Sequence, residues 1–304
     1  MLVEEPRDEA SRNQLLDADV PAWWQWLGLP GIFDVHVHFL PPNIQAKVWA
    51  QFDRAGPKIG RAWPIRYRGD HDERVEQLRA MGVRHFSSLP YAHKPGIAAY
   101  LNDWSRDFAA AVPECLWSAT FYPEPGVEGY VAALIAEGVQ VFKLHTQVGE
   151  FELADPLMTQ AFGLLEDAGT PIVIHVGSGP VPNEFTGPAF LAALLERHPR
   201  LRVIVAHMGA PEYRRFLKLA EAYENTMLDT TMVFTDFFDG VGTYPADLLP
   251  RLVDLQHKIL LGTDFPTIPY AYAHQLESLE RLDLGDDWLR AVCWENGARL
   301  FGVE

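Results

Sequence analysis

Cysteine is scarce in this chain, and basic residues are outnumbered by acidic ones. Its 304 residues include two cysteines, 25 Lys and Arg, and 41 Asp and Glu, which give a formal net charge of −16. Two thiols so far apart, Cys115 and Cys293, form neither a disulfide framework nor a thiolate metal site, and we expect both to be buried. The acidic balance argues against binding to nucleic acid, which requires clustered basic side chains.

Long hydrophobic runs are also absent. No apolar stretch approaches the ~20 residues that a membrane-spanning helix needs, and residues 1–19 are acidic and polar, without the apolar core of a signal peptide. Hydrophobic residues make up 48% of the chain and charged residues 22%, which is typical of a globular protein with a large core. We therefore expect a cytoplasmic protein without a membrane role, whose partner is a small-molecule substrate.

Short runs rich in β-branched residues alternate with stretches that have apolar residues at helical spacing, such as residues 127–137, 156–168, 187–198 and 211–224. Strands that alternate with helices indicate parallel strands joined by right-handed crossovers. Eight such units predict an α/β protein of the (β/α)8 TIM-barrel class. The predicted strands are residues 32–38, 83–89, 116–121, 139–145, 171–176, 201–207, 226–230 and 258–264.

Two segments extend this single domain, which we assign to residues 1–304. The N-terminal extension, residues 1–30, contains a helix expected over residues 12–27, whose tryptophans would cover one surface of the barrel. The second segment, residues 40–72, is a long loop rich in Pro, Gly and aromatic residues. It leaves the first strand at the face where such barrels hold their active sites, so we interpret it as a lid-like insertion.

His36 and His38 end the first predicted strand and indicate metal binding. Residues two apart on a strand point to the same face, so the two imidazoles lie side by side. A single histidine at a strand end is commonly structural, but here polar residues end several successive strands, and a closed barrel brings those ends to one mouth. The further residues are Lys143, His145, His175, His207 and Asp264.

Three imidazoles and one carboxylate form a donor set that suits a single divalent metal. Zn²⁺ is the expected ion, and Mn²⁺, Fe²⁺ and Co²⁺ are alternatives. A site with an open coordination position is catalytic, because the metal lowers the pKa of bound water towards ~7 or polarises a substrate oxygen.

Five short motifs carry a family resemblance. They resemble the amidohydrolase superfamily, and in particular its amidohydrolase-2 group of TIM-barrel metal-dependent hydrolases, which also contains decarboxylases of the aminocarboxymuconate-semialdehyde and hydroxybenzoate types. The resemblance runs from about residue 30 to the end of the sequence. The motifs are Asp34-Val35-His36-Val37-His38, Phe142-Lys143-Leu144-His145, Ile174-His175-Val176-Gly177, Ala206-His207-Met208-Gly209 and Gly262-Thr263-Asp264-Phe265-Pro266.

The resemblance implies a role for each residue. His36, His38 and His175 would bind one metal together with Asp264. His207 would be catalytic, either by orienting water or by stabilising oxyanion charge. Asp264 would also take the proton of the attacking water and pass it to the leaving group.

Lys143 has two interpretations. In other branches of the superfamily a lysine on the fourth strand is carboxylated and bridges two metals, and His207 would then bind the second metal. We favour an unmodified ammonium that binds a substrate carboxylate or a neighbouring acidic side chain. The other candidate substrate contacts are His145, His93, Arg66 and Tyr122.

We therefore expect a metal-dependent hydrolase that acts on a small amide, lactone or ester through metal-activated water. The same residues also suit a carboxy-lyase, for the non-oxidative decarboxylation of a small aromatic or unsaturated acid. A third interpretation is a barrel that only binds a metabolite or a metal. The resemblance and the frequency of twofold oligomers also lead us to expect a homodimer.

Overall fold

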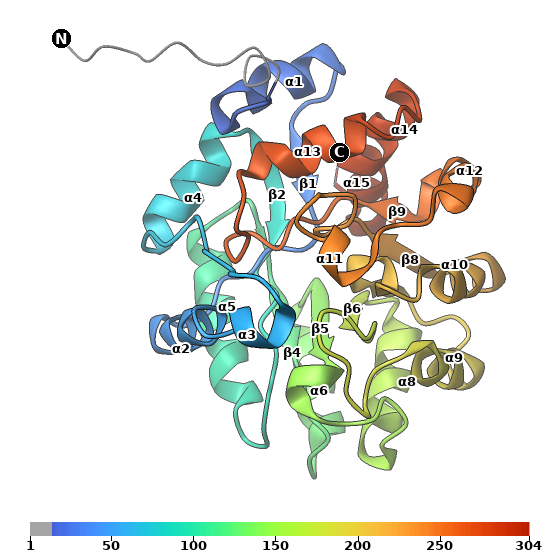
Figure 1. The fold of residues 1–304 in the computed structure, drawn as a ribbon. Coiled ribbons are helices and arrows are strands. Elements are labelled where there is room, and N and C mark those ends of the chain that lie inside the picture. Colours follow the sequence, from blue (N-terminus) through green and yellow to red (C-terminus); the bar gives the residue numbers. More distant parts are fainter. Residues whose placement is uncertain (1–13, 304) are drawn as a thin grey trace.

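Parallel strands occupy the centre of the structure, and helices surround them (Figure 1). The computed structural model describes residues 14–303, so the first part of the predicted N-terminal extension lies outside the described residues. Every strand pairing is parallel, as the alternation of strands and helices predicts. The strands are β1 Ile32–Asp34, β2 Val83–Ser87, β3 Cys115–Leu116, β4 Ser118–Thr120, β5 Val141–His145, β6 Ile172–His175, β7 Val203–Val205, β8 Thr226–Asp229 and β9 Ile259–Leu260.

The strands pair in sequence order around the barrel. One sheet has the order β1-β2-β3 and the other has the order β4-β5-β6-β7-β8-β9. Only Trp117 separates β3 from β4, so these two short strands correspond to the single strand predicted over residues 116–121. The backbone N–H of Trp117 donates to Oε1 of Gln140 (2.9 Å) instead of to a neighbouring strand.

Backbone hydrogen bonds join the first strand to the last. The N–H of Val35 donates to the carbonyl of Leu261 (2.9 Å), and the N–H of His38 donates to that of Phe265 (2.7 Å). Val37 and Phe265 form a parallel β-bridge. We call this junction of residues 35–38 with residues 261–265 the seam. It completes the (β/α)8 TIM barrel that the sequence predicts.

The helices follow the predicted pattern closely, and α6 has the predicted bounds. Within residues 14–303, every helix is too short or too polar to cross a bilayer. The α-helices are α1 Val20–Trp26, α2 Pro42–Phe52, α3 Gly56–Ile59, α4 His71–Ala80, α5 Ala98–Ala111, α6 Val127–Glu137, α7 Thr146–Gly149, α8 Thr159–Ala168, α9 Pro188–Arg197, α10 Tyr213–Ala222, α11 Asp239–Gly242, α12 Leu249–Asp254, α13 Tyr272–Glu280, α14 Asp286–Arg290 and α15 Asn296–Phe301. Short 3-10 turns cover Asp17–Asp19, Pro156–Met158, Ala206–Gly209, Ala246–Leu248 and Gln256–Lys258, and a π-helical turn covers Ala291–Glu295.

The central strands are buried on both faces. Val203, Ile204 and Val205 of β7 have no exposed surface. Such burial is typical of parallel sheets that helices cover. Each aliphatic side chain buried in this way contributes ~1.5–3 kcal/mol relative to an exposed one. The polar residues at the strand ends therefore rest on a rigid apolar frame.

Tryptophans of α1 cover the end of the barrel where the strands begin. Trp23 is buried, and its Nε1 donates to Oε2 of Glu280 (3.0 Å). Nε1 of Trp24 donates to the carbonyl of Met81 (3.1 Å), just before β2. Trp26 instead has 62% of its surface exposed. Two of the three tryptophans thus cover the barrel as we expected.

The segment after β1 contains helices, and the prediction of a loop over residues 40–72 is wrong for this part. Pro42 occupies the start of α2, where the fixed φ of proline and its missing N–H favour a helix rather than a turn. The remainder is packed against the chain after β9. Nε1 of Trp63 donates to the carbonyl of Thr267 (2.6 Å), and the hydroxyl of Tyr67 accepts the backbone N–H of Tyr272 (2.6 Å).

Candidate metal centre

The seam places His36, His38 and Asp264 together. His36 and His38 follow β1, while Asp264 follows β9. Nε2 of His38 lies 3.0 Å from Oδ1 of Asp264, and Nε2 of His36 lies 3.7 Å from the same oxygen. All three residues are buried, and each offers a ligand atom within 4.8 Å of the others. These donors form a group that could hold one cation.

Left-handed backbone conformations occur at two of the predicted site residues. Asp264 has φ +70° and His207 has φ +54°, although neither is glycine. Such conformations cost ~1–3 kcal/mol each and concentrate at functional sites, where surrounding contacts hold them.

Four buried histidines each have one ring nitrogen within hydrogen-bonding distance of a fixed oxygen. Because each of these oxygens is an acceptor, the nearby nitrogen carries the proton, and the other nitrogen of a neutral ring keeps its lone pair. This arrangement is typical of metal-binding histidines, which donate their second N–H to a carbonyl or carboxylate. The pairs are His36 Nδ1 with Asp229 Oδ2 (2.8 Å), His38 Nδ1 with Leu89 O (2.9 Å), His175 Nε2 with Gly179 O (3.1 Å) and His207 Nδ1 with Thr231 O (3.0 Å).

Burial keeps several of these imidazoles neutral. Burial and the nearby charge of Lys143 lower the pKa of His36 to about 3. Burial also lowers the pKa of His207, and it lowers the pKa values of His145 and His175 well below the ordinary range. The neutral imidazole is the form that binds metal.

The carboxylates of the cluster are anionic. Burial alone would raise the pKa of Asp264, but the neighbouring imidazoles of His38 and His36 hold this pKa well below its usual range. The pKa of Asp229 is likewise held low against the effect of burial, mainly by His36. Asp34 differs, because burial raises its pKa to about 7.

Lys143 and His145 extend the cluster along β5. Lys143 is 1% exposed, and its Nζ lies 3.0 Å from Nε2 of His36. Burial lowers the pKa of Lys143 to about 8. The ring of His145 stacks on that of His175, with centroids 3.9 Å apart. The ring of His175 also contacts that of His207, with centroids 4.8 Å apart, and the ring of His207 lies 5.3 Å from that of His36. His175 itself is not one of the three donors that lie within 4.8 Å of one another.

Three predicted substrate contacts lie outside this cluster. The hydroxyl of Tyr122 donates to the carbonyl of Gly149 (2.9 Å), and its ring lines a hollow of about 410 Å³ formed by the segments that follow β4, β5 and β6. His93 and Arg66 are exposed. The backbone N–H of Arg66 donates to the carbonyl of Ile268 (3.0 Å). Substrate contact by these three side chains stays a prediction.

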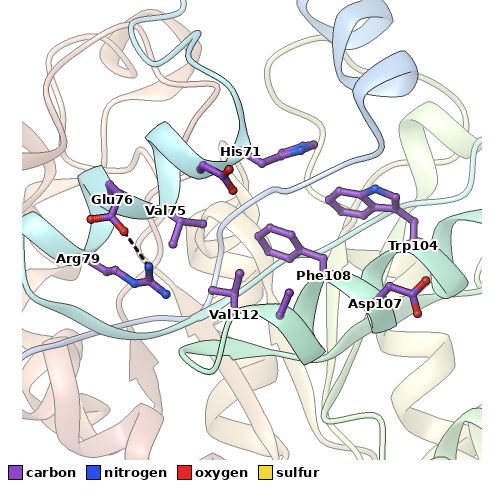
Figure 2. A pocket seen from close by; sticks show the side chains of 10 residues that line it. His71, Val75, Glu76, Arg79, Trp104, Asp107, Phe108 and Val112 are labelled. Atoms are coloured by element: carbon purple, nitrogen blue, oxygen red, sulfur yellow. Dashed lines mark hydrogen bonds and ion pairs between the residues drawn. The ribbon is translucent and has the colours of Figure 1, made fainter.

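A second hollow, of about 400 Å³, lies outside the barrel between α4 and α5 (Figure 2). Its floor includes Val75, Trp104 and Phe108, and an ion pair between Glu76 and Arg79 lies at its edge. None of the predicted site residues lines it. It is therefore separate from the candidate metal centre.

Sequence reasoning missed Asp229, which ends β8 and contacts the ring of His36. The signal that identified His175 and Asp264, a polar residue at the end of an apolar strand, was also present here. The strand predicted over residues 226–230 contains this acidic residue next to its end.

The fold and the cluster define a TIM-barrel protein with buried imidazole and carboxylate donors at the C-terminal ends of its strands. The chain belongs to the amidohydrolase family, whose model matches residues 33–303. The resemblance seen in the motifs is thereby confirmed, and the protein is an enzyme of the amidohydrolase superfamily.

Solved structures with the same fold include a decarboxylase and a dihydroorotase. An uncharacterized TIM-barrel protein from Bordetella bronchiseptica has a TM-score of 0.72 and 18% identity, over 90% of this chain and 98% of its own. The 5-carboxyvanillate decarboxylase of Novosphingobium aromaticivorans, complexed with manganese and a nitrobenzoic acid, has a TM-score of 0.64 and 14% identity, over 91% and 97%. Dihydroorotase from Campylobacter jejuni has a TM-score of 0.56 and 13% identity, over 90% and 84%. The comparison with curated proteins found no match.

Proposed function

We propose that this protein is a metal-dependent hydrolase of a small amide, lactone or ester. In this proposal His36, His38, His175 and Asp264 hold one divalent cation, with zinc as the expected ion. The carrying observation is the buried, anionic carboxylate of Asp264, 3.0 Å from Nε2 of His38. A cation held there supplies Lewis-acid activation of water and of the substrate carbonyl.

The charge of the cluster supports the presence of a cation. Asp229 and Asp264 are both buried and anionic, the nearby imidazoles of His36 and His207 are neutral, and Lys143 supplies one positive charge. Buried charges are costly unless they are paired. A divalent cation therefore offsets the negative charge that Lys143 alone does not balance.

Asp264 would act as the proton shuttle. Because its carboxylate is ionised, it accepts the proton of the attacking water and returns it to the leaving oxygen or nitrogen. His207 would orient that water. Nδ1 of His207 donates to the carbonyl of Thr231 (3.0 Å), so the neutral ring offers Nε2 only as an acceptor. This supports water orientation rather than stabilisation of an oxyanion by His207.

Decarboxylation of a small aromatic acid is the second candidate. Aromatic rings flank the cluster and would suit a flat substrate. The ring of Tyr91 lies 5.6 Å from that of His38 and 5.3 Å from that of His145. The ring of Phe238 is nearly parallel to that of His207, with centroids 5.9 Å apart.

The two functions separate in one comparison. Zinc-loaded protein would be assayed against lactones and esters by proton release, against amides by release of the amine, and against aromatic acids by release of CO₂. We expect turnover of a carbonyl substrate that Asp264→Asn abolishes. His198→Gln, which alters a buried histidine paired with Glu166 (3.5 Å) away from the cluster, is the matched control. Release of CO₂ without turnover of any carbonyl substrate would reject the hydrolase.

A further inference from the structure

One buried carboxylate, that of Asp229, touches two site histidines in different ways. Asp229 ends β8 and has no exposed surface. Its Oδ2 lies 2.8 Å from Nδ1 of His36. Its Oδ1 accepts the backbone N–H of His207 (2.8 Å) and that of Thr231 (3.1 Å). The two oxygens therefore connect residues that follow β1, β7 and β8.

We infer that Asp229 is a positioning residue that fixes the tautomer of His36 and the backbone of His207. The inference rests on the proposed function, because it concerns His36 as a metal ligand. Asp229 itself lies behind the imidazole, on the side of Nδ1. It acts through His36 rather than on a substrate.

Contacts on both sides of the His36 ring select the same tautomer. A carboxylate only accepts hydrogen bonds, so Nδ1 of His36 must carry the proton that Asp229 receives. On the opposite side, Nζ of Lys143 lies 3.0 Å from Nε2 of His36, and an ammonium only donates. Nε2 is therefore the unprotonated nitrogen, and it also faces Asp264 (3.7 Å).

The second oxygen of Asp229 holds a strained turn. His207 adopts φ +54°, a conformation that is unfavourable for a non-glycine residue. Its backbone N–H donates to the charged carboxylate of Asp229, and a hydrogen bond to a charged acceptor is strong enough to offset that cost. The carbonyl of Thr231 accepts a hydrogen bond from the Nδ1–H of His207 (3.0 Å). The ring and the backbone of His207 are therefore both held in place.

Asp229→Asn tests the inference, and Asp34→Asn is the matched control. Asparagine keeps the shape of Asp229 but would present an amide N–H to Nδ1 of His36, which favours the tautomer protonated on Nε2. Asp34 is also fully buried and accepts the backbone N–H of His36 (3.1 Å), but its other oxygen accepts the hydroxyl of Thr263 (2.6 Å) rather than the imidazole.

The first readout is the tautomer of His36 in metal-free protein, measured from ¹⁵N shifts of labelled imidazoles. We expect the proton on Nδ1 in the wild type and in Asp34→Asn, and on Nε2 in Asp229→Asn. The measurement on the wild type does not depend on whether a variant folds. A wild-type His36 protonated on Nε2 would overturn the inference, and so would an unchanged tautomer in a folded Asp229→Asn.

The second readout is zinc affinity, measured by competition with a chromophoric chelator. Loss of an outer-shell partner typically weakens metal affinity ~10–100-fold, and we expect this for Asp229→Asn but not for Asp34→Asn. Equal zinc affinity of Asp229→Asn and the wild type would contradict the inference. A wild type that binds no zinc would instead reject the proposed function. The tautomer of His36 would still test whether Asp229 positions that ring.

Discussion

Nε2 of His38 and Oδ1 of Asp264 lie 3.0 Å apart, although the two residues follow the first and the last strand of the barrel. The β-bridge between Val37 and Phe265 lies directly beside them. The candidate metal centre and the closure of the barrel therefore depend on the same few residues. Changes at the seam should affect both stability and metal binding.

Metal removal is expected to destabilise the protein. A ligand that binds only the native state raises the free energy of unfolding by ~2.7 kcal/mol when its free concentration is 100 times Kd. Differential scanning calorimetry of chelator-treated protein, with increasing zinc, measures this effect. In Asp264→Ala, added zinc should raise the melting temperature only slightly. A melting temperature of the wild type that does not respond to zinc would contradict the predicted site.

Lys143→Ala is expected to retain the metal. We predict one zinc or manganese per chain, because His36, His38, His175 and Asp264 suffice for one ion. Metal content by plasma mass spectrometry, on protein purified without added metal, checks this number in the wild type and in the variant. Two metals that are lost together with Lys143 would show that this lysine is a carboxylated bridge.

Gly262→Ala is expected to destabilise the seam. An added Cβ would lie 2.1 Å from Oγ1 of Thr231 and 2.8 Å from Cβ of His36, so both neighbours must move. Overpacking of this kind costs typically ~1–3 kcal/mol. Urea unfolding measures the change. In Gly129→Ala, within α6, the added Cβ meets no atom within 4 Å, and we expect a gain of up to ~1 kcal/mol. Equal stability of the two variants would refute this packing argument.

The two thiols are expected to make the protein less stable in alkali. Burial raises the pKa of Cys115 from 9.0 to about 12, and it raises the pKa of Cys293 further. Between pH 9.0 and about pH 12 the unfolded chain loses thiol protons that the native chain keeps. The free energy of unfolding therefore falls as pH rises. Each thiol contributes ~1.4 kcal/mol per pH unit.

Urea unfolding at pH 8 to 11 measures this dependence. The double variant Cys115→Ala, Cys293→Ala is the control, because it keeps every other group that titrates in this range. A wild type that loses no more stability than the double variant would contradict the prediction. Thiol reagents should also label both cysteines in urea but neither in native protein.

The barrel could be predicted because its strands have a strong local signal. Runs such as Val203–Val205, buried on both faces, are apolar at every position, and glycines such as Gly138 end the helices before the strands. The predicted strands were too long at their ends. After Asp34, the backbone hydrogen bonds pass to the seam, and after Val205 they form a 3-10 turn. No local pattern encodes those changes.

The candidate site was predicted only in part. His36, His38 and Asp264 could be found because they end apolar strands, and the structure brings them together. The contact of Asp229 with His36 depends on distances across the barrel, which the sequence does not give. The exposure of His93 depends on where one loop leaves the barrel.

The seam also orders events in time. A growing chain makes His36 and His38 early, but Asp264 lies near the end of the sequence. The donor group therefore exists only after the last strand has docked beside the first. Ion uptake would report the completion of folding rather than assist its start, and any event that parts the first strand from the last would take Asp264 away from His36 and His38.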